Sequence, residues 1–367
     1  MRTAISDQLG IAHPIFAFTP SEQVAAAVSR AGGMGVLGCV RFNDAEELES
    51  VLSWMDENTD GKPYGVDIVM PAKIPDEGSA LDLGKYIPDG HRKFVDDTLR
   101  KLGVPPLPAD GDPARDGVLG WLHSVARTHV DVALQHPIKL IANALGSPPK
   151  DVIDLAHAHG VPVAALAGKA KHARSHVDNG VDIVIAQGTE AGGHTGEIAT
   201  MVLVPEIVDA VGTDAHVLAA GGIGSGRQIA AALALGAGGV WMGSYWLTTS
   251  EYRLGTGDAM QRALVAAGSD QTVRARVYSG KPARLLKTKW TQAWSEEGAP
   301  DPLPMPLQNL LVSEAHQRIA LSDDPEVVAM PVGQIVGRMN AVRPVAEVFD
   351  ELVSEFDETL HRLDKTR

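Results

Sequence analysis

The feature that most constrains the fold is a repeat in which a short apolar run is followed by a turn and a helical pattern that ends in glycine. The runs are apolar throughout rather than at alternate positions, which is typical of parallel strands covered on both faces. Eight strand–helix units favour a closed (β/α)8 TIM barrel over an open doubly wound sheet. The expected strands span residues 13–18, 35–40, 64–70, 138–145, 161–168, 181–188, 216–223 and 238–244, and helical patterns lie at 21–31, 45–57, 151–159, 169–179, 201–211 and 227–235.

Two regions interrupt this repeat and set the expected domain organisation. We expect residues 1–250 to form the barrel and residues 72–137 to be an insertion after the third strand, with helical patches at 92–102 and 117–135. A long insertion on that side of a strand stands over the mouth of a barrel, so we expect either a lid or a dimer contact. Residues 251–367 are expected to form a mainly helical extension that ends in a closing helix at 345–363.

Composition and charge narrow the class of protein. The formal net charge of −14 disfavours a nucleic-acid partner, because phosphate binding needs a basic surface. The stretch 228–250 carries no charge, but its glycines and its split into a helical and a β-like half favour a buried helix–strand unit over a membrane span. The first seven residues lack the apolar core of a signal peptide, and the lone Cys39 suits a reducing compartment. These features predict a soluble cytoplasmic protein, and a homodimer is also compatible with them.

The strongest chemical signal is a glycine-rich segment with one histidine at the end of the sixth strand. The segment reads AQGTEAGGHTG at 186–196 and contains His194. In a TIM barrel the active site lies at the carboxyl ends of the strands, where glycines let the backbone approach a planar ligand. A histidine there can move protons near neutral pH. The alternative is a glycine-rich turn with an incidental surface histidine, and we favour the functional interpretation.

A second glycine-rich segment follows the seventh strand, and a third follows the eighth. They read AAGGIGSGRQ at 219–228 and Gly243-Ser244. Loops at these places, together with a helix N-terminus, are the usual phosphate site of this fold. The spacing G-x-G-x-G differs from a dinucleotide fingerprint, and close helix–strand packing is the other explanation. We predict phosphate binding.

Other candidates for chemistry are weak. His172 and His176 have a spacing that could hold a metal, but no third ligand accompanies them, so we expect solvated helix residues and no metal. Cys39 could be a reactive thiol at the mouth of the barrel, although a small core residue is the commoner role.

These segments together resemble the nitronate monooxygenase family, formerly called 2-nitropropane dioxygenases. The resemblance rests on QGTEAGGHTG at 187–196, AGGIGSGRQ at 220–228 and YSGKPAR at 278–284, where the last is similar to the family's S-G-R-P-A-R element. It implies an FMN-dependent barrel enzyme with His194 as the catalytic residue. Carried over by position, the residues expected at the cofactor are Gln187, Gly192, Gly193, Gly221, Gly222, Gly243, Ser244 and Asp67.

The sequence departs from the family pattern at positions that bear on the substrate. Asp67 stands where the family usually has asparagine, and a charged acid there would oppose reduction of a flavin unless it is protonated or points away. The leading function is oxidation of alkyl nitronates with O2 to a carbonyl compound and nitrite. The alternative is an NAD(P)H-dependent flavin reductase of enones, enoyl thioesters or quinones, with Arg41, Arg92 and Lys93 as candidate nucleotide contacts. A barrel that only binds its ligand would not need His194.

Overall fold

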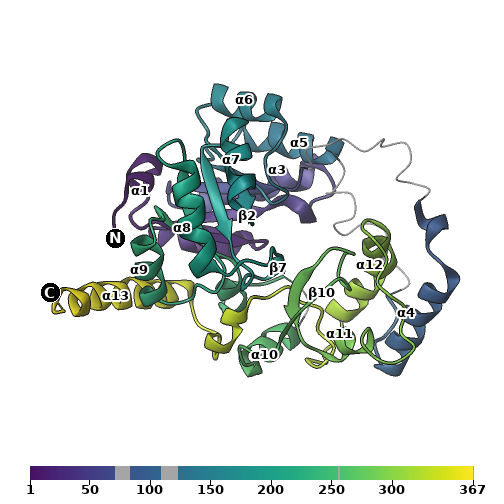
Figure 1. Ribbon diagram of the computed structural model, residues 1–367. Coiled ribbons are helices and arrows are strands. Elements are labelled where there is room, and N and C mark those ends of the chain that lie inside the picture. Colours follow the sequence, from purple (N-terminus) through teal and green to yellow (C-terminus); the bar gives the residue numbers. More distant parts are fainter. Residues whose placement is uncertain (71–82, 109–122, 255–256, 367) are drawn as a thin grey trace.

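The computed structural model describes residues 1–70, 83–108, 123–254 and 257–366, and the side chains of 123–124 lie outside that description. Its centre is a closed barrel of eight parallel strands (Figure 1), so the predicted TIM barrel is confirmed. Each pair of neighbours is parallel, and β1 closes the ring on β9. The strands are β1 (Ile15–Thr19), β2 (Met34–Gly38), β3 (Tyr64–Ile68), β4 (Ile141–Asn143), β5 (Val163–Ala167), β6 (Ile183–Gln187), β8 (His216–Ala220) and β9 (Gly239–Met242).

Helices surround the barrel as the repeat predicts. They are α2 (Glu22–Arg30), α3 (Ala45–Asn58), α5 (His123–Ala133), α6 (Lys150–Ala158), α7 (Ala170–Asp178), α8 (Thr200–Val211) and α9 (Gly226–Ala234). The uncharged stretch 228–250 forms most of α9, then β9 and the 3-10 helix η4 (Ser244–Thr248). Within the described part of the chain, no helix has the length and apolar character needed to cross a membrane.

The interior of the barrel is filled by side chains. Phe16, Met34, Ile185 and Leu218 from alternate strand positions form one buried cluster. The short helix α1 (Ala4–Leu9) contributes Ile5 to the same cluster, so it packs against the barrel interior. This filling leaves the carboxyl ends of the strands as the place where a ligand can enter.

The extension after the barrel contains strands as well as helices. Strands β10 (Thr272–Ala275) and β11 (Ala283–Leu286) form an antiparallel pair, and β11 also pairs with β7 (Gly193–His194). The sequence analysis did not expect these strands. The extension also holds α10 (Ala259–Ala266), α11 (Lys289–Ala293) and α12 (Leu307–Ala320).

One of the two described helices of the insertion packs against the extension, and the other packs against the barrel. Helix α4 (Asp89–Lys101) lies beside α12 (Figure 1), and the rings of Phe94 and Trp294 meet edge to face at 4.8 Å. The other expected helical patch, 117–135, starts outside the described residues and continues as α5, which packs on α3. The rest of the insertion, at 71–82 and 109–122, also lies outside the described residues.

The chain ends in α13 (Val345–Asp364), which packs on α9 and α2 of the barrel. The expected closing helix, 345–363, begins at the same residue as α13 and ends one residue before it. Val348, Leu352 and Phe356 are buried on its inner face. The contact with α9 is close: a Cβ atom on Gly226 would lie 2.2 Å from the Phe356 nitrogen and 2.4 Å from the Leu352 oxygen.

This contact gives a test of the barrel–helix packing. Gly226→Ala should lower the free energy of unfolding by about 2 kcal/mol or more, because backbone atoms must move apart. Gly90→Ala is the control, since no atom lies within 4 Å of the position that its Cβ would take, and it should change stability by less than about 1 kcal/mol. Urea unfolding of both variants measures the difference. Equal stabilities would contradict the tight α9–α13 packing.

Candidate functional site

The predicted glycine-rich segments meet at the carboxyl ends of three neighbouring strands. Gln187 is the last residue of β6 and pairs in register with Ala220, the last residue of β8. Ala220 in turn pairs with Trp241 of β9. Gly221 and the pair Gly243-Ser244 therefore follow adjacent strands. The structure brings together the three segments that the sequence analysis singled out.

Gly221 and Gly222 form a turn that a side chain could not occupy. Their φ angles are +106° and +70°, in the left-handed region that favours glycine. A Cβ on Gly221 would lie 2.8 Å from the Thr200 Oγ1 atom. Within the described chain, the amides of Gly222 and Ile223 have no hydrogen-bond acceptor. Unpaired amides in a glycine turn at the mouth of a barrel suit a phosphate group.

The N-terminus of α9, which we expected to share in phosphate binding, is already occupied. The Gly226 amide donates to the Glu355 carboxylate of α13 at 2.8 Å, and the Gln228 amide donates to the Ser225 hydroxyl at 3.2 Å. The Gly224 amide donates to the Gln228 side chain at 3.0 Å. A carboxylate at the helix start repels a second anion, so this helix N-terminus is less suited to a phosphate than the sequence suggested. The amides that remain available to a ligand are those of Gly222 and Ile223, before the helix.

The extension supports the other side of this cradle, by which we mean the turn at Gly221 and Gly222 together with Gly243 and Ser244. The Gly333 amide donates to the Ser244 hydroxyl at 2.9 Å, which leaves that hydroxyl's own proton available to a ligand.

The same segment of the extension lies against the loop after β6. A Cβ on Gly192 would be 2.7 Å from the Val332 carbonyl carbon. Gly193, in contrast, has open space on its side-chain face, with no atom within 4 Å. A flat ring can approach the backbone there.

His194 lies in the two-residue strand β7 (Gly193–His194), within the glycine-rich segment that follows β6. Its backbone pairs with Ala283 of β11. Its Nε2 atom shares a hydrogen bond of 2.6 Å with the hydroxyl of Ser279, which is fully buried. Burial, and then the positive charge of Lys281, lowers the pKa of His194 to about 4, so the ring is neutral at pH 7.

Two further contacts hold the loop that carries His194. The Glu190 carboxylate accepts hydrogen bonds from the Thr200 amide and hydroxyl at 3.0 and 2.9 Å. The Arg284 guanidinium donates to the Thr189 carbonyl at 2.9 Å. Neither these residues nor Ser279 received a role from the sequence. The motif at 278–284, which contains both the serine and the arginine, was the available signal.

Asp67 points into the barrel from β3. Its neighbours Val66 and Ile68 belong to the core between strands and helices, so the alternation of a strand places the Asp67 carboxyl inside. The side chain is buried, and this burial raises the pKa of Asp67 to about 8. The acid is therefore protonated at pH 7. A neutral carboxyl removes the charge conflict with a reduced flavin that the sequence raised.

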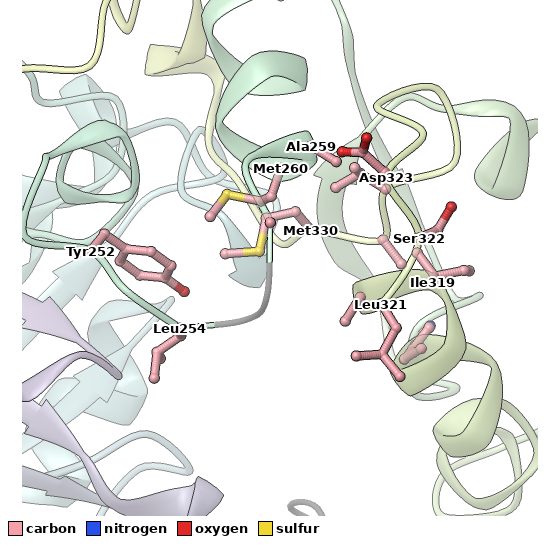
Figure 2. A pocket seen from close by; sticks show the side chains of 14 residues that line it. Tyr252, Leu254, Ala259, Met260, Ile319, Leu321, Ser322, Asp323 and Met330 are labelled. Atoms are coloured by element: carbon pink, nitrogen blue, oxygen red, sulfur yellow. The ribbon is translucent and has the colours of Figure 1, made fainter. Parts of the chain in front are cut away.

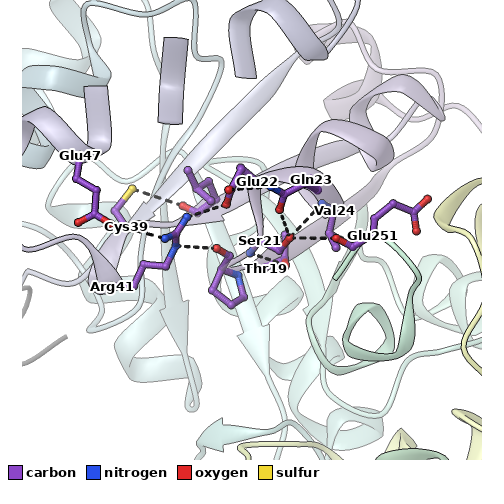
Figure 3. A network of polar contacts seen from close by, with 11 residues as sticks. Thr19, Ser21, Glu22, Gln23, Val24, Cys39, Arg41, Glu47 and Glu251 are labelled. Atoms are coloured by element: carbon purple, nitrogen blue, oxygen red, sulfur yellow. Dashed lines mark hydrogen bonds and ion pairs between the residues drawn. The ribbon is translucent and has the colours of Figure 1, made fainter. Parts of the chain in front are cut away.

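Arg41 forms ion pairs and a hydrogen bond with other residues of the protein. Figure 3 shows its side chain between the carboxylates of Glu22 and Glu47, at 2.7 and 3.9 Å. Its Nε atom donates to the Pro20 carbonyl at 3.0 Å. The nearby Cys39 is fully buried, and burial raises the pKa of its thiol, so it is a core residue.

The other two candidate nucleotide contacts also bind protein groups. On α4, Arg92 donates to the Gly84 carbonyl at 2.5 Å, and Lys93 pairs with Asp97.

The histidine pair on α7 does not form a metal site. His176 is half-buried against the Leu166 carbonyl at 3.2 Å, so the expectation of a solvated residue was wrong for it, whereas His172 is exposed. Among the described residues, no group of three or more His, Cys, Asp or Glu side chains could hold a metal.

Comparison with known proteins gives matches over the whole chain. Residues 2–355 match the nitronate monooxygenase family. The chain is 50% identical, over 99% of its length and 98% of the relative, to a Mycobacterium tuberculosis protein that carries the provisional name of a monooxygenase. It is 30% identical, over 81% of its length and 69% of the relative, to an octahydroindene-carboxyl-CoA dehydrogenase of Rhodococcus jostii. The crystal structure of a Streptomyces ansochromogenes nitroalkane oxidase covers 98% of this chain and 100% of its own, with a TM-score of 0.79 and 28% identity.

The glycine turn can be tested by flavin content. Gly222→Val should abolish stoichiometric flavin binding, because a Cβ at this φ of +70° strains the turn and would lie 3.3 Å from the Glu190 Cβ atom. Gly212→Val is a matched control: its φ is +56°, so it suffers similar strain, but no atom lies within 4 Å of the new Cβ. The ratio of bound flavin to protein is measured after purification. Full flavin content in the Gly222 variant would refute this turn as the phosphate site.

The buried acid gives a pH-dependent prediction. Between about pH 4 and about pH 8, the folded protein keeps the Asp67 proton while the unfolded chain releases it. The stability of the wild type should therefore fall with rising pH, relative to Asp67→Asn, by up to about 1.4 kcal/mol per pH unit. Urea unfolding near the two ends of this range measures the trend. Parallel stability profiles would show that Asp67 titrates normally.

Proposed function

Because the chain belongs to the nitronate monooxygenase family, we propose that it is an FMN-dependent oxidoreductase that converts alkyl nitronates and O2 into a carbonyl compound and nitrite. The resemblance seen in the sequence is thereby confirmed at the level of the family. Members of this family are flavin-dependent oxidoreductases, and the similar nitroalkane oxidase supports this class of substrate. The observation that carries the proposal is the neutral, half-buried His194, which Ser279 holds in the glycine-rich segment after β6.

The cradle suits FMN in the donors that it offers. The amides of Gly222 and Ile223 and the Ser244 hydroxyl would hold the phosphate, together with the backbone of Gly221 and Gly243.

The flavin ring would lie against the strand ends, bordered by Gln187, Gly192, Gly193 and Asp67. When bound, the cofactor supplies the electron transfer from the substrate and the reduction of O2. The protein supplies binding and orientation.

The neutral form of His194 favours a nitronate over the neutral nitroalkane as the substrate. Removal of the α-proton from a nitroalkane needs a base, and a pKa of about 4 makes His194 a weak one in the free protein. A nitronate has already lost that proton. Its negative charge would draw a hydrogen bond from the imidazole, and Ser279 at 2.6 Å fixes the orientation of the ring for this contact.

The alternative function as a reductase has one observation in its favour and one against it. The Rhodococcus jostii relative is named as a dehydrogenase, and this name is consistent with a redox partner other than O2. A nicotinamide dinucleotide would need phosphate-binding groups of its own, because the cradle would hold the FMN phosphate. The three basic residues considered for that role, Arg41, Arg92 and Lys93, already bind protein groups. We therefore assign O2, and not NAD(P)H, as the co-substrate.

The test compares oxidants and substrates in the flavin-loaded protein. Under anaerobic conditions an alkyl nitronate should bleach the flavin band, and NADH or NADPH should not. In air, the nitronate should yield nitrite and a carbonyl compound in equal amounts. His194→Asn should keep its flavin, lose severalfold in turnover of the nitronate, and lose about 100-fold or more with the neutral nitroalkane.

Two results would overturn parts of this proposal. Rapid bleaching by NADPH with no reaction of nitronates would establish the reductase alternative. Unchanged turnover in the His194 variant, with full flavin content, would remove the catalytic role of this residue. His216→Asn serves as the control substitution, because this residue begins β8, at the opposite end of the strand from the cradle, and its ring is hydrogen-bonded to Gln8.

A further inference from the structure

A cavity of about 330 Å³ is lined by residues of the extension, and none of its described lining residues belongs to the glycine cradle. Figure 2 shows Tyr252, from the segment after η4, on one side and Leu321 and Asp323, from the segment after α12, across the cavity. Met260 of α10 and Met330 lie between them. The proposed function gives this space no role.

The walls of the cavity are mostly apolar. The majority of the lining side chains are aliphatic or methionine, including Ile319 and Ala329. His316 also lines it; its ring stacks on Tyr278 at 4.8 Å, and burial lowers the pKa of His316 to about 4, so it is neutral. The carboxylate of Asp323 is paired with Arg262 at 2.6 Å.

The mostly apolar lining determines which class of ligand the cavity can bind. Among the described residues that line the cavity, none is lysine or arginine. A phosphate or carboxylate would therefore enter without a cation to pair with, and its desolvation would not be compensated. An uncharged hydrocarbon chain meets no such penalty and gains from leaving water. Methionine walls adapt to chains of different shape.

Two short stretches of chain join the cavity to the catalytic site. On one side, the Tyr278 ring that stacks on His316 is followed by Ser279, which is hydrogen-bonded to His194. On the other side, Met330 of the cavity wall leads within two residues to the segment that lies against Gly192. The wall of the cavity is thus linked to the candidate site through Tyr278 and Ser279 and through residues 330–332, all of which belong to the extension.

We propose that this cavity binds the apolar chain of the substrate, so that the enzyme prefers nitronates with an extended alkyl substituent of several carbons. The inference rests on the proposed function and adds the substrate class. With the nitronate group at His194, the chain would lie beside Tyr278 and extend toward Met260 and Met330. Each methylene buried there should raise kcat/KM about threefold to fourfold until the cavity is full.

The experiment measures kcat/KM for a series of primary n-alkyl nitronates of increasing length. Calorimetric titration of the holoenzyme with 1-alkanols of matching lengths reports binding without turnover. Ala329→Phe fills the cavity, so the ratio of long-chain to short-chain kcat/KM should fall at least tenfold. Met260→Ala enlarges it, so the plateau should move to longer chains. Ala234→Phe, on the exposed surface of α9, is the size-matched control and should keep the wild-type ratio.

The outcomes separate this inference from the function on which it rests. A length-independent series in the wild type overturns the cavity assignment, and so does an Ala329→Phe variant that is folded and flavin-loaded but keeps the wild-type ratio. If no nitronate reacts but the alkanols bind more tightly with length and Ala329→Phe abolishes the trend, the nitronate function fails and the cavity remains a site for an apolar chain. The Met260 variant tests the assignment if the Ala329 variant does not fold.

Discussion

The pairing of β7 with β11 is the interaction on which the site depends. It places two residues of the loop after β6 in a sheet with the extension, in the register His194 opposite Ala283 and Gly193 opposite Arg284. Backbone hydrogen bonds then fix the position of His194, and Ser279, just before β11, fixes its ring. Side chains on strands are held more firmly than side chains on loops. The extension is therefore part of the candidate active site, because without it His194 would lose both supports.

Burial sets the electrostatics of the site. It moves the pKa of His194 down to about 4 and that of Asp67 up to about 8, so both groups are neutral at pH 7. The anionic cofactor would then be held by amide dipoles rather than by cations, which suits a chain with a net charge of −14. In such a site the largest charges belong to the substrate and the flavin. A neutral imidazole responds strongly to an arriving anion, since little water screens the interaction.

The barrel could be predicted from sequence because each strand is apolar along its whole length and each helix carries its own pattern. The closing helix was equally clear, with Val348, Leu352 and Phe356 on one face. The strands β7, β10 and β11 have two to four residues, and they form only because distant segments pair. For the same reason the sequence could not show that Glu355 of α13 reaches the Gly226 amide. The motifs located the site, but its supports come from contacts between residues far apart in the chain.

The hairpin that contains Ser279 and Ala283 contacts both His194 and the wall of the apolar cavity. One end of it holds His194, and the Tyr278 ring at that same end packs on His316 in the wall of the apolar cavity. A substitution in the cavity can thus move His194 through two contacts, whereas the glycine turn of the cradle follows β8 of the barrel. The relatives are named for oxidation of a nitroalkane and for dehydrogenation of a CoA thioester, so proteins similar to this chain carry out more than one reaction.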